Sequence, residues 1–387
     1  MERNHAPIAM ESAMSHKRVL GSLVLLIIGL CPSVAIGQHY TQTNLVSNTG
    51  AAPVPDSNLR NAWGLVHGPT TPWWVSNNFT GTSTLYNVST TPTTIPPLVV
   101  TIPNAPSGMA PGKPTAVMFN GSPTDFLLDK TSTPPKQAIF IWATEDGTIS
   151  GWNPGVKATE AVIKADNSQK PKKDHGAVYK GATIAEIHGQ KYILAANFRS
   201  GEIDVFDTNF MQVDLPKHAF RDQKLPKGFA PFNVQGIGPN VYVTYAKQDD
   251  DQMDDVPGEG LGYVDVFTPE GDLIQRLDHG KFLNAPWGVT LAPAFFGEFS
   301  HAVIVGNFGD GTIAAFNPVS GEFLGNMLTP AGAKLSITGL WGLAFGNGGP
   351  SGPGNTMFFT AGPNDETDGL FGSLTPIAAE LAENDEQ

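Results

Sequence analysis

Cysteine is almost absent from this chain. Among its 387 residues there is one, Cys31, at the end of an N-terminal apolar stretch. If that stretch is cleaved off, no thiol is left to form a disulfide or to hold a metal ion. The fold of the remaining chain must therefore rest on hydrogen bonds and packing.

Charged residues are scarce as well, and basic ones are the scarcer. They make up 15% of the chain, with 23 Lys and Arg against 36 Asp and Glu, and the formal net charge is -13. A negative surface repels phosphate groups. The composition therefore argues against nucleic acid and anionic membrane surfaces as partners.

Long hydrophobic runs are missing except for one, at residues 19–30. The basic pair Lys17-Arg18 precedes it and small residues at 35–37 follow it, which is the layout of a secretory signal. The run is shorter than the roughly twenty residues that span a bilayer. Residues 1–37 are therefore predicted to be a signal peptide, the protein to be secreted or periplasmic, and no membrane span to remain after cleavage.

The motifs of familiar enzymes are missing too. The sequence has no Gly-x-Ser-x-Gly, no His-Glu-x-x-His and no Walker loop, and its histidines are scattered without the spacing of metal ligands. No catalytic residue is predicted, and whether the protein is an enzyme stays open at this stage.

What the sequence does contain is a sixfold repeat. Six segments combine a tight turn with a short strand that ends near aromatic or apolar residues: 81–87, 146–154, 200–207, 262–268, 310–318 and 368–373. Each follows an apolar, β-rich run: 73–77, 138–142, 192–197, 241–245, 302–307 and 356–360. Asp-Gly or Ser-Gly between two such runs favours a hairpin, because both residue types tolerate the positive φ of a primed turn.

A small apolar segment ahead of each hairpin predicts an innermost strand. The clear ones are Trp63-Gly64-Leu65, Trp287-Gly288-Val289 and Trp341-Gly342-Leu343, and the weaker ones are 115–117, 182–184 and 232–234. A repeat of about fifty residues with three or four strands is typical of a propeller blade. The predicted fold class is all-β, a six-bladed β-propeller over residues 38–376. The aromatic residues of these segments either pack between blades or form a stacking platform for a carbohydrate.

The two ends of the repeat indicate how the ring closes. The sixth blade lacks a fourth strand of its own, while residues 40–47 form a strand-like segment without a blade. We predict that this N-terminal strand completes the last blade and closes the ring, which removes open sheet edges. Residues 377–387 are rich in acidic side chains and are predicted to be a disordered tail.

One face of the predicted ring collects polar side chains. Because successive strands alternate in direction, the turns between second and third strands open on the same face as the loops that lead into the inner strands. Amides and carboxylates from several blades meet there, as a sugar-like ligand or a metal ion would require. The candidate ligand-binding residues are Asn78, Glu145, Asp146, Asn197, Asn307, Asp310 and Asp365. For each of them a hairpin turn or a strand-end cap is the alternative.

The corresponding turn of blade four is longer and strongly acidic, with five Asp among residues 249–255. These charges repel one another unless a cation or basic groups lie among them, so Asp249, Asp251 and Asp254 are candidate ligands for Ca²⁺. The loop does not match an EF-hand, because Asp254 stands where the sharp turn needs Gly. A solvated loop without metal is the alternative.

Six of the segments together are specific for a known family: residues 74–78, 143–152, 195–199, 245–249, 306–311 and 360–366. From about Asn44 to Thr375 the chain resembles uncharacterised exported bacterial β-propeller proteins, some of which carry a C-terminal PEP-CTERM sorting tail. This sequence ends without that tail, so sorting-dependent attachment is not implied. The resemblance implies the fold and export, and no particular activity.

These features predict an exported propeller that acts as a ligand-binding module for a carbohydrate or another extracytoplasmic ligand. The alternative is a calcium-dependent hydrolase of the lactonase or sugar-esterase kind, in which Ca²⁺ polarises a carbonyl group. The alternative rests on analogy of fold, and propellers host many unrelated functions. No protein partner is predicted.

Overall fold

The computed structural model describes residues 39–170 and 176–377. The predicted leader, residues 1–37, and residues 378–387 of the predicted tail lie outside the described residues. Apart from the 3₁₀ turn η1 (Gly297–Phe299), every regular element of the described part is a strand. None of its helices is long or apolar enough to cross a membrane.

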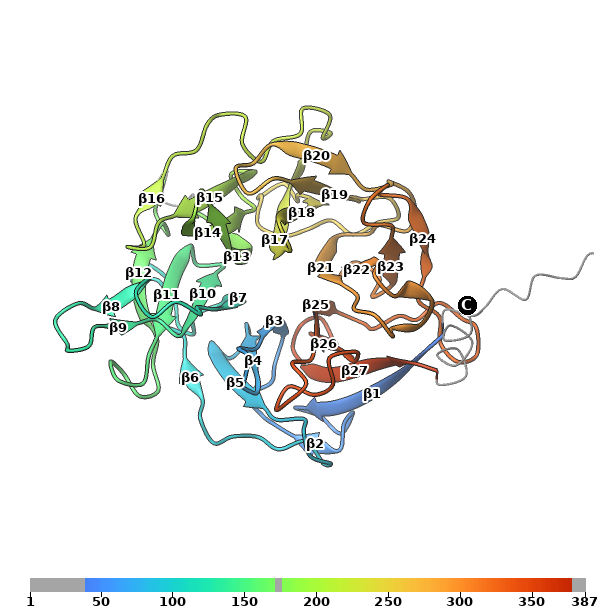
Figure 1. Ribbon diagram of the computed structural model, residues 1–387, viewed down its shortest axis with the longest axis horizontal. Coiled ribbons are helices and arrows are strands. Elements are labelled where there is room, and N and C mark those ends of the chain that lie inside the picture. Colours follow the sequence, from blue (N-terminus) through green and yellow to red (C-terminus); the bar gives the residue numbers. More distant parts are fainter. Residues whose placement is uncertain (1–38, 171–175, 378–387) are drawn as a thin grey trace, which may run out of the picture. The chain divides into compact units, whose positions relative to one another are not determined.

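Six sheets surround a central axis, and each is one blade (Figure 1). From the axis outward, blade 1 holds β3 (Ala62–Val66), β4 (Trp73–Asn77), β5 (Thr82–Tyr86) and β6 (Val100–Thr101). Blade 2 holds β7 (Pro114–Phe119), β10 (Phe140–Thr144), β11 (Thr148–Trp152) and β12 (Val162–Asp166), with the separate hairpin β8 (Leu127–Asp129) and β9 (Lys136–Gln137). Blade 3 holds β13 (Tyr179–Ile187), β14 (Gln190–Asn197), β15 (Glu202–Phe206) and β16 (Gln212–Val213).

The other three blades follow the same order. Blade 4 holds β17 (Phe229–Ile237), β18 (Asn240–Lys247), β19 (Gly262–Phe267) and β20 (Leu273–Arg276). Blade 5 holds β21 (Pro286–Leu291), β22 (Val303–Asn307), β23 (Ile313–Phe316) and β24 (Phe323–Asn326). Blade 6 holds β25 (Leu340–Phe345), β26 (Met357–Ala361), β27 (Leu370–Pro376), β1 (Tyr40–Ser47) and β2 (Val54–Pro55). The predicted all-β, six-bladed propeller is therefore confirmed.

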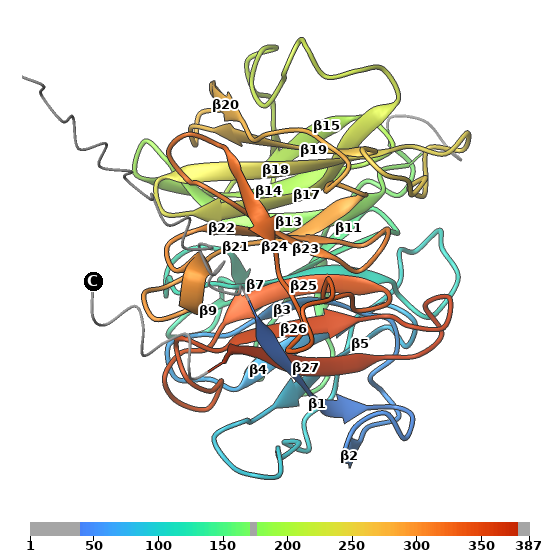
Figure 2. The same ribbon diagram turned by 90° about the vertical axis from the view of Figure 1, so that its right-hand side faces the viewer.

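The ring is closed by its first strand, as predicted. β1 pairs antiparallel with β27, from Tyr40 opposite Pro376 to Ser47 opposite Leu370. Seen from the side, β1 lies along β27 in the last blade (Figure 2). The short β2 adds a parallel fifth strand that the sequence did not predict. The outer strands of the sixth blade, β1 and β2, thus come from a part of the chain that is distant in sequence from its inner strands, β25 to β27.

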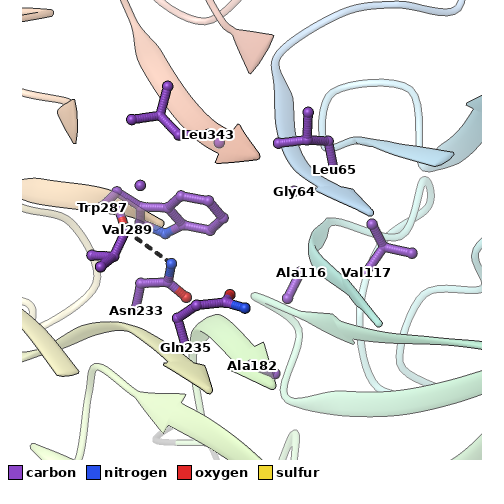
Figure 3. A pocket seen from close by; sticks show the side chains of 12 residues that line it. Gly64, Leu65, Ala116, Val117, Ala182, Asn233, Gln235, Trp287, Val289 and Leu343 are labelled. Carbon is purple, nitrogen blue, oxygen red and sulfur yellow. Dashed lines mark hydrogen bonds between the residues drawn. The ribbon is translucent and has the colours of Figure 1, made fainter. Parts of the chain in front are cut away.

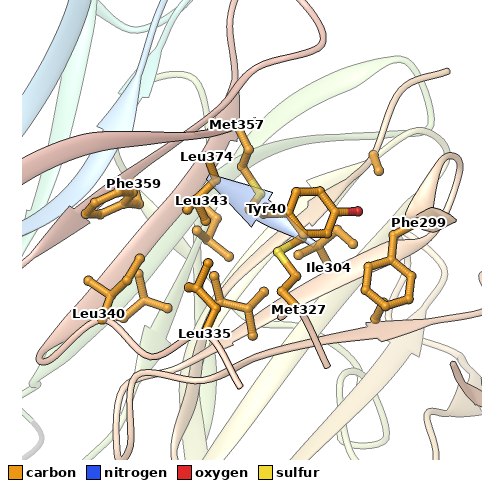
Figure 4. Close-up of a cluster of buried hydrophobic side chains, with 14 of the residues drawn as sticks. Tyr40, Phe299, Ile304, Met327, Leu335, Leu340, Leu343, Met357, Phe359 and Leu374 are labelled. Atoms are coloured by element: carbon orange, nitrogen blue, oxygen red, sulfur yellow. The ribbon is translucent and has the colours of Figure 1, made fainter. Parts of the chain in front are cut away.

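The space between neighbouring blades is filled by apolar side chains. Between blades 5 and 6, Met327, Leu335, Met357 and Leu374 pack with Tyr40 of the closing strand (Figure 4). Tyr40 is 1% exposed, and its hydroxyl donates a hydrogen bond to the Phe296 carbonyl at 2.9 Å. Burial of this apolar surface is the main stabilising term of the ring.

Candidate functional site

Every inner strand carries a β-bulge near its start. In blade 3, Tyr179 pairs with Asn197 and Gly181 pairs with Ala196, so Lys180 is the extra residue. The inner strands of the other five blades shift register at the same point. A bulge re-aims its side chain. The residues at these six positions form what we call the bulge ring: Trp63, Thr115, Lys180, Phe232, Trp287 and Trp341.

The aromatic members of the bulge ring meet across the channel. Trp63 of blade 1 stacks on Trp341 of blade 6, with ring centroids 3.5 Å apart. Trp287 of blade 5 contacts both edge-on, at 6.1 and 5.7 Å. Such pairs stabilise a core beyond the area that they bury. Since Trp63 and Trp341 are each 1% exposed, the structure favours packing over an open sugar-stacking platform for these residues.

Lys180 is the basic member of the bulge ring. Its Nζ donates to Glu145 Oε1 at 2.5 Å and to Asp254 Oδ1 at 2.8 Å, and it lies 5.3 Å from the centroid of the Trp63 ring. Burial of Lys180 opposes its charge, but the two carboxylates outweigh burial and raise the pKa of Lys180 above its ordinary value. The ammonium is therefore a fixed positive charge at the channel and a poor nucleophile.

A second ring of equivalent residues lies at the mouth of the channel. The residue directly after each second strand donates its backbone N–H to the carbonyl just ahead of the inner strand, as Asn78 does to Asn61 at 2.9 Å and Glu145 to Lys113 at 3.0 Å. We call these six residues the mouth ring: Asn78, Glu145, Phe198, Gln248, Phe308 and Gly362.

Polar side chains connect the mouth ring across several blades. Asn78 Nδ2 donates to Glu145 Oε2 at 2.8 Å. Asn61 Nδ2 donates to Glu366 Oε2 at 2.6 Å, and Asn61 Oδ1 accepts a hydrogen bond from Trp341 Nε1 at 3.1 Å. Together with the contacts of Lys180 to Glu145 and Asp254, these hydrogen bonds join five blades, all but blade 5.

Two carboxyl groups of the mouth are held partly protonated near neutral pH. Burial, and then the negative charge of Glu145, raise the pKa of Glu366 to about 7. Burial likewise raises the pKa of Asp255 to about 6, against the attraction of Lys180. Asp255 Oδ2 is buried and has no hydrogen-bond partner within the described residues. The attraction of Lys180 is therefore too weak to offset the burial of these two carboxyl groups.

Glu366 is presented by an unusual turn between β26 and β27. Asn364, Asp365 and Glu366 have φ values of 57°, 49° and 61°. Side chains disfavour this left-handed region, and Asn and Asp tolerate it better than Glu. Asn364 Nδ2 donates to Thr367 Oγ1 at 2.9 Å, and Arg60 Nε donates to the Thr367 carbonyl at 2.7 Å, which holds the turn in place. Strain of this kind gathers at functional sites.

A pocket of about 490 Å³ opens beside this turn. We call it the mouth pocket. It lies between the turns of blades 5 and 6 and the loop of blade 4, and its lining residues are Pro257, Phe308, Gly309, Asp310, Thr338, Gly339, Gly362, Asp365 and Glu366. Phe308 stacks on Trp341, with centroids 3.9 Å apart, and thereby joins the pocket to the bulge ring.

The channel on the other side of the bulge ring is narrow. It is lined by residues further along the inner strands, among them Leu65, Val117 and Leu343, with Asn233 and Gln235 as its polar members (Figure 3). The Asn233 amide is bound to the Trp287 carbonyl at 2.8 Å. A volume of about 40 Å³ has room for water and for little else. The mouth pocket is the better candidate for a ligand.

The structure places several predicted ligand-binding residues at this mouth. Asn78 and Glu145 belong to the mouth ring and contact each other. Asp310 and Asp365 line the mouth pocket. Asp146 lies in the hairpin turn after Glu145, where it accepts a backbone hydrogen bond at 3.1 Å, and burial raises its pKa. The structure thus brings two pairs of these residues to the mouth from four blades.

Asn197 and Asn307 lie one residue before the mouth ring and make the contacts of strand-end caps. Asn197 Nδ2 donates to Asp204 Oδ2 at 3.0 Å, and Asn307 Nδ2 donates to Thr312 Oγ1 at 3.0 Å. Asn197 and Asn307 are 4% and 0% exposed. In these two blades the residues of the mouth ring are Phe198 and Phe308 instead.

A basic group from another blade reaches the acidic loop of blade 4: Lys180, on the inner strand of blade 3, binds Asp254. Asp249 accepts backbone hydrogen bonds from Met253 at 2.9 Å and from Asp254 at 3.3 Å, and Asp251 is exposed. Within residues 39–170 and 176–377, no group of three or more His, Cys, Asp or Glu side chains is arranged to hold a metal ion. The structure thus does not gather these Asp residues into a calcium site.

Lys180 was not predicted from the sequence, and Glu366, although it follows Asp365 on the predicted polar face, was not among the candidate ligand-binding residues. The inner strand of blade 3 was predicted from Ala182-Thr183-Ile184, two residues too late, because Lys180-Gly181 takes the place that Trp-Gly has in three other blades. The Gly after the bulge was the available signal. For Glu366 no local signal exists, because burial and neighbouring blades create its environment.

Comparison with known proteins supports the fold and shows a family. No protein-family model matches the chain. It is 31% identical to "Uncharacterized protein R648" of Acanthamoeba polyphaga mimivirus over 342 residues, 85% of this chain and 78% of that protein. It is also 31% identical to "Uncharacterized protein L690" of the same virus, over 85% of this chain and 84% of that protein. The chain belongs to the family of these proteins.

A third relative from this virus, "Uncharacterized protein R640", is 31% identical over 235 residues, and the chain spans 42% of its length. Among solved structures, one named glucose dehydrogenase aligns with a TM-score of 0.51 at 13% identity, over 87% of this chain and 99% of that chain. A protein of unknown function from Bacteroides thetaiotaomicron aligns with a TM-score of 0.50 at 10% identity, over 87% of this chain and 76% of that chain. At these identities the likeness shows the propeller fold alone.

Proposed function

We propose that the protein is an exported propeller that binds a small, polyhydroxylated ligand of the carbohydrate class in the mouth pocket. The observation that carries this proposal is the pocket itself. Its volume of about 490 Å³ falls in the range of small-molecule sites, roughly 300–1,000 Å³. Export to the periplasm or beyond rests on the sequence of residues 1–37.

The lining suits a ligand with hydroxyl groups. The carboxylates of Asp310, Asp365 and Glu366 accept hydrogen bonds, and charged acceptors form stronger ones than neutral acceptors. Glycines at three lining positions leave backbone groups accessible to a ligand. Phe308 supplies an aromatic surface, which the apolar face of a sugar ring would cover.

A hydrolase is the second candidate, and Glu366 is the observation that favours it. A carboxyl group with a pKa raised to about 7 by burial can give and take a proton at neutral pH, and it lines a pocket. The test is turnover of sugar lactones and acyl sugars by the wild type and by Glu366→Gln. Turnover that disappears in the variant would support a hydrolase. Equal rates in both proteins, or no turnover in either, would favour a ligand-binding module.

Binding itself is tested with a thermal-shift screen of mono- and disaccharides, followed by isothermal titration calorimetry. We expect a saccharide that raises the Tm of the wild type, and Asp365→Asn to weaken its binding about tenfold by removing one charged hydrogen bond. Asn tolerates the positive φ at this position, so the turn should persist. Asp214→Asn, at an exposed position of blade 3, is the matched control and should bind normally.

No saccharide binding in the screen would contradict the proposal. So would binding that Asp365→Asn leaves unchanged while Asn233→Ala, at the narrow end of the channel, abolishes it.

A further inference from the structure

All the ionisable side chains among the described residues that line the mouth pocket are acidic. Three of its lining residues, Asp310, Asp365 and Glu366, carry carboxyl groups, and none of the described lining residues is basic. Asp310 commits Oδ1 to a turn contact with the backbone N–H of Thr312 at 2.9 Å. Glu366 commits Oε2 to Asn61, and its Oε1 has no hydrogen-bond partner within the described residues. The described lining therefore offers carboxylate acceptors and no basic side chain to pair with them.

The same mouth already binds one ammonium group, that of Lys180. Two carboxylates, from Glu145 and Asp254, hold it, and the face of Trp63 lies 5.3 Å away. Carboxylates combined with an aromatic ring are the usual surroundings of a bound organic cation. The mouth pocket repeats this combination with different residues, because Phe308 lies among its three carboxyl groups.

Lys180 does not neutralise the whole mouth. Its two partners are engaged with it, while Asp255 and Glu366 remain as carboxyl groups without a cation of their own. Asp255 Oδ2 is buried without a hydrogen-bond partner in the part of the chain that the structure describes. Glu366 lines the mouth pocket, so a positively charged ligand bound there would lower the electrostatic cost of ionising it.

We propose that the ligand of the mouth pocket carries a positive charge, an ammonium group on a hydroxylated frame such as an amino sugar, bound between Asp365, Glu366 and the ring of Phe308. This inference rests on the proposed function and adds the charge of the ligand to it. A neutral sugar would leave the negative charge of the pocket uncompensated, and an acidic sugar would be repelled.

Four small probes separate the possibilities, with binding to the purified protein measured by calorimetry at low ionic strength. Glucosamine and glucose differ by an ammonium group in place of a hydroxyl, glucuronate carries a negative charge, and choline is a cation without a sugar ring. We expect glucosamine to bind at least about tenfold more tightly than glucose, from one added charge-assisted contact, and glucuronate not to bind. Added salt should weaken the binding of glucosamine.

Two further measurements place the charge in the pocket. Asp365→Asn should weaken glucosamine binding by about fivefold to tenfold and affect glucose less, while the control Asp214→Asn should change neither. Choline keeps its charge at every pH, so its affinity should rise between pH 5 and pH 8 as Glu366 loses its proton.

The outcomes distinguish this inference from the proposed function. If glucose or glucuronate binds as tightly as glucosamine, the positive charge is wrong and carbohydrate binding stands. If choline binds and no sugar does, the charge stands and the carbohydrate class is wrong. If none of the four binds, both proposals are overturned.

Discussion

Lys180 is the residue on which the electrostatics of the mouth depend. Its side chain is 3% exposed, and its partners Glu145 and Asp254 are 14% and 73% exposed. Replacing Lys180 with Met keeps much of its volume and leaves Glu145 as a buried carboxylate without its cation. Removing one partner of a buried ion pair typically costs about 3–5 kcal/mol. We expect Lys180→Met to lower the free energy of unfolding by about 3 kcal/mol in a urea titration.

The matched control is Lys157→Met. Lys157 pairs with Glu160, and the two side chains are 48% and 47% exposed. Exposed pairs of this kind contribute about 0.2–1 kcal/mol. Equal losses for the two variants would show that Lys180 is not a buried electrostatic centre.

Glu366 makes a different prediction, because its charge depends on pH. Burial raises its pKa from 4.5 to about 7, so the folded protein holds this proton more tightly than the unfolded chain does. Stability from this group is fully present below about pH 4.5 and is lost as the pH rises towards 7. Glu366→Gln removes that dependence.

The stability of the Glu366→Gln variant relative to the wild type should therefore increase from pH 4.5 to pH 8, by up to about 3 kcal/mol for a pKa shift of this size. Urea titrations at several pH values measure the difference, and Glu298→Gln, at an exposed glutamate outside the mouth, is the control. A difference that is flat or falls with pH would contradict the raised pKa.

At the scale of the strand, the bulge near the start of each inner strand sets the geometry of the site. It turns one side chain per blade towards the channel, and four of the six bulges are followed by Gly. At Gly288 an added Cβ would lie 2.6 Å from the Trp341 carbonyl oxygen. The inner strand of blade 6 therefore lies too close to Gly288 to leave room for a side chain there. Glycine is required at position 288 because a side chain would have no space, and not because the backbone has a positive φ.

Gly288→Ala should therefore lower the free energy of unfolding by about 1–3 kcal/mol, the usual range for overpacking a close contact. Thermal unfolding followed by circular dichroism measures this loss. Gly50→Ala is the control, since nothing lies within 4 Å of a Cβ added there. If both variants melt alike, the inner strands have room that the structure does not show.

The strands themselves could be predicted because the information is local. Alternating apolar residues predicted the hairpins of all six blades, supported in blades 2, 3, 5 and 6 by an Asp-Gly or Ser-Gly turn, and the unpaired segment 40–47 predicted the closing strand. The bulge register could not be read in blade 3, because Lys180 there breaks the aromatic pattern that marks Trp63, Trp287 and Trp341. A one-residue difference in register likewise separates Asn197 and Asn307 from the mouth ring.

The site was predictable in part for the same reason. Asp310 and Asp365 lie in turns that the repeat identifies, so their face could be predicted. The role of Glu366 depends on Asn61, 305 positions away in sequence, and on the charge of Glu145. Contacts of that range exist only after the ring has closed, and no local pattern records them.

At the scale of the whole molecule, the site exists because the ring is closed. Blade 6 supplies Glu366, and its outer sheet is completed by β1, which also reaches blade 5 through the Tyr40 hydroxyl. Deleting residues 40–47 should expose the edge of β27 and lower the Tm sharply, whereas deleting residues 378–387, predicted from composition to be a tail, should have little effect. Equal effects of the two deletions would count against closure by β1.

The most direct test of a ligand site at the mouth is a crystal structure of the protein grown with glucosamine. We expect density in the mouth pocket, with the amine near Asp365 and Glu366 and the ring beside Phe308. Density between two blades or at the narrow end of the channel near Gln235, with the mouth pocket empty, would contradict it.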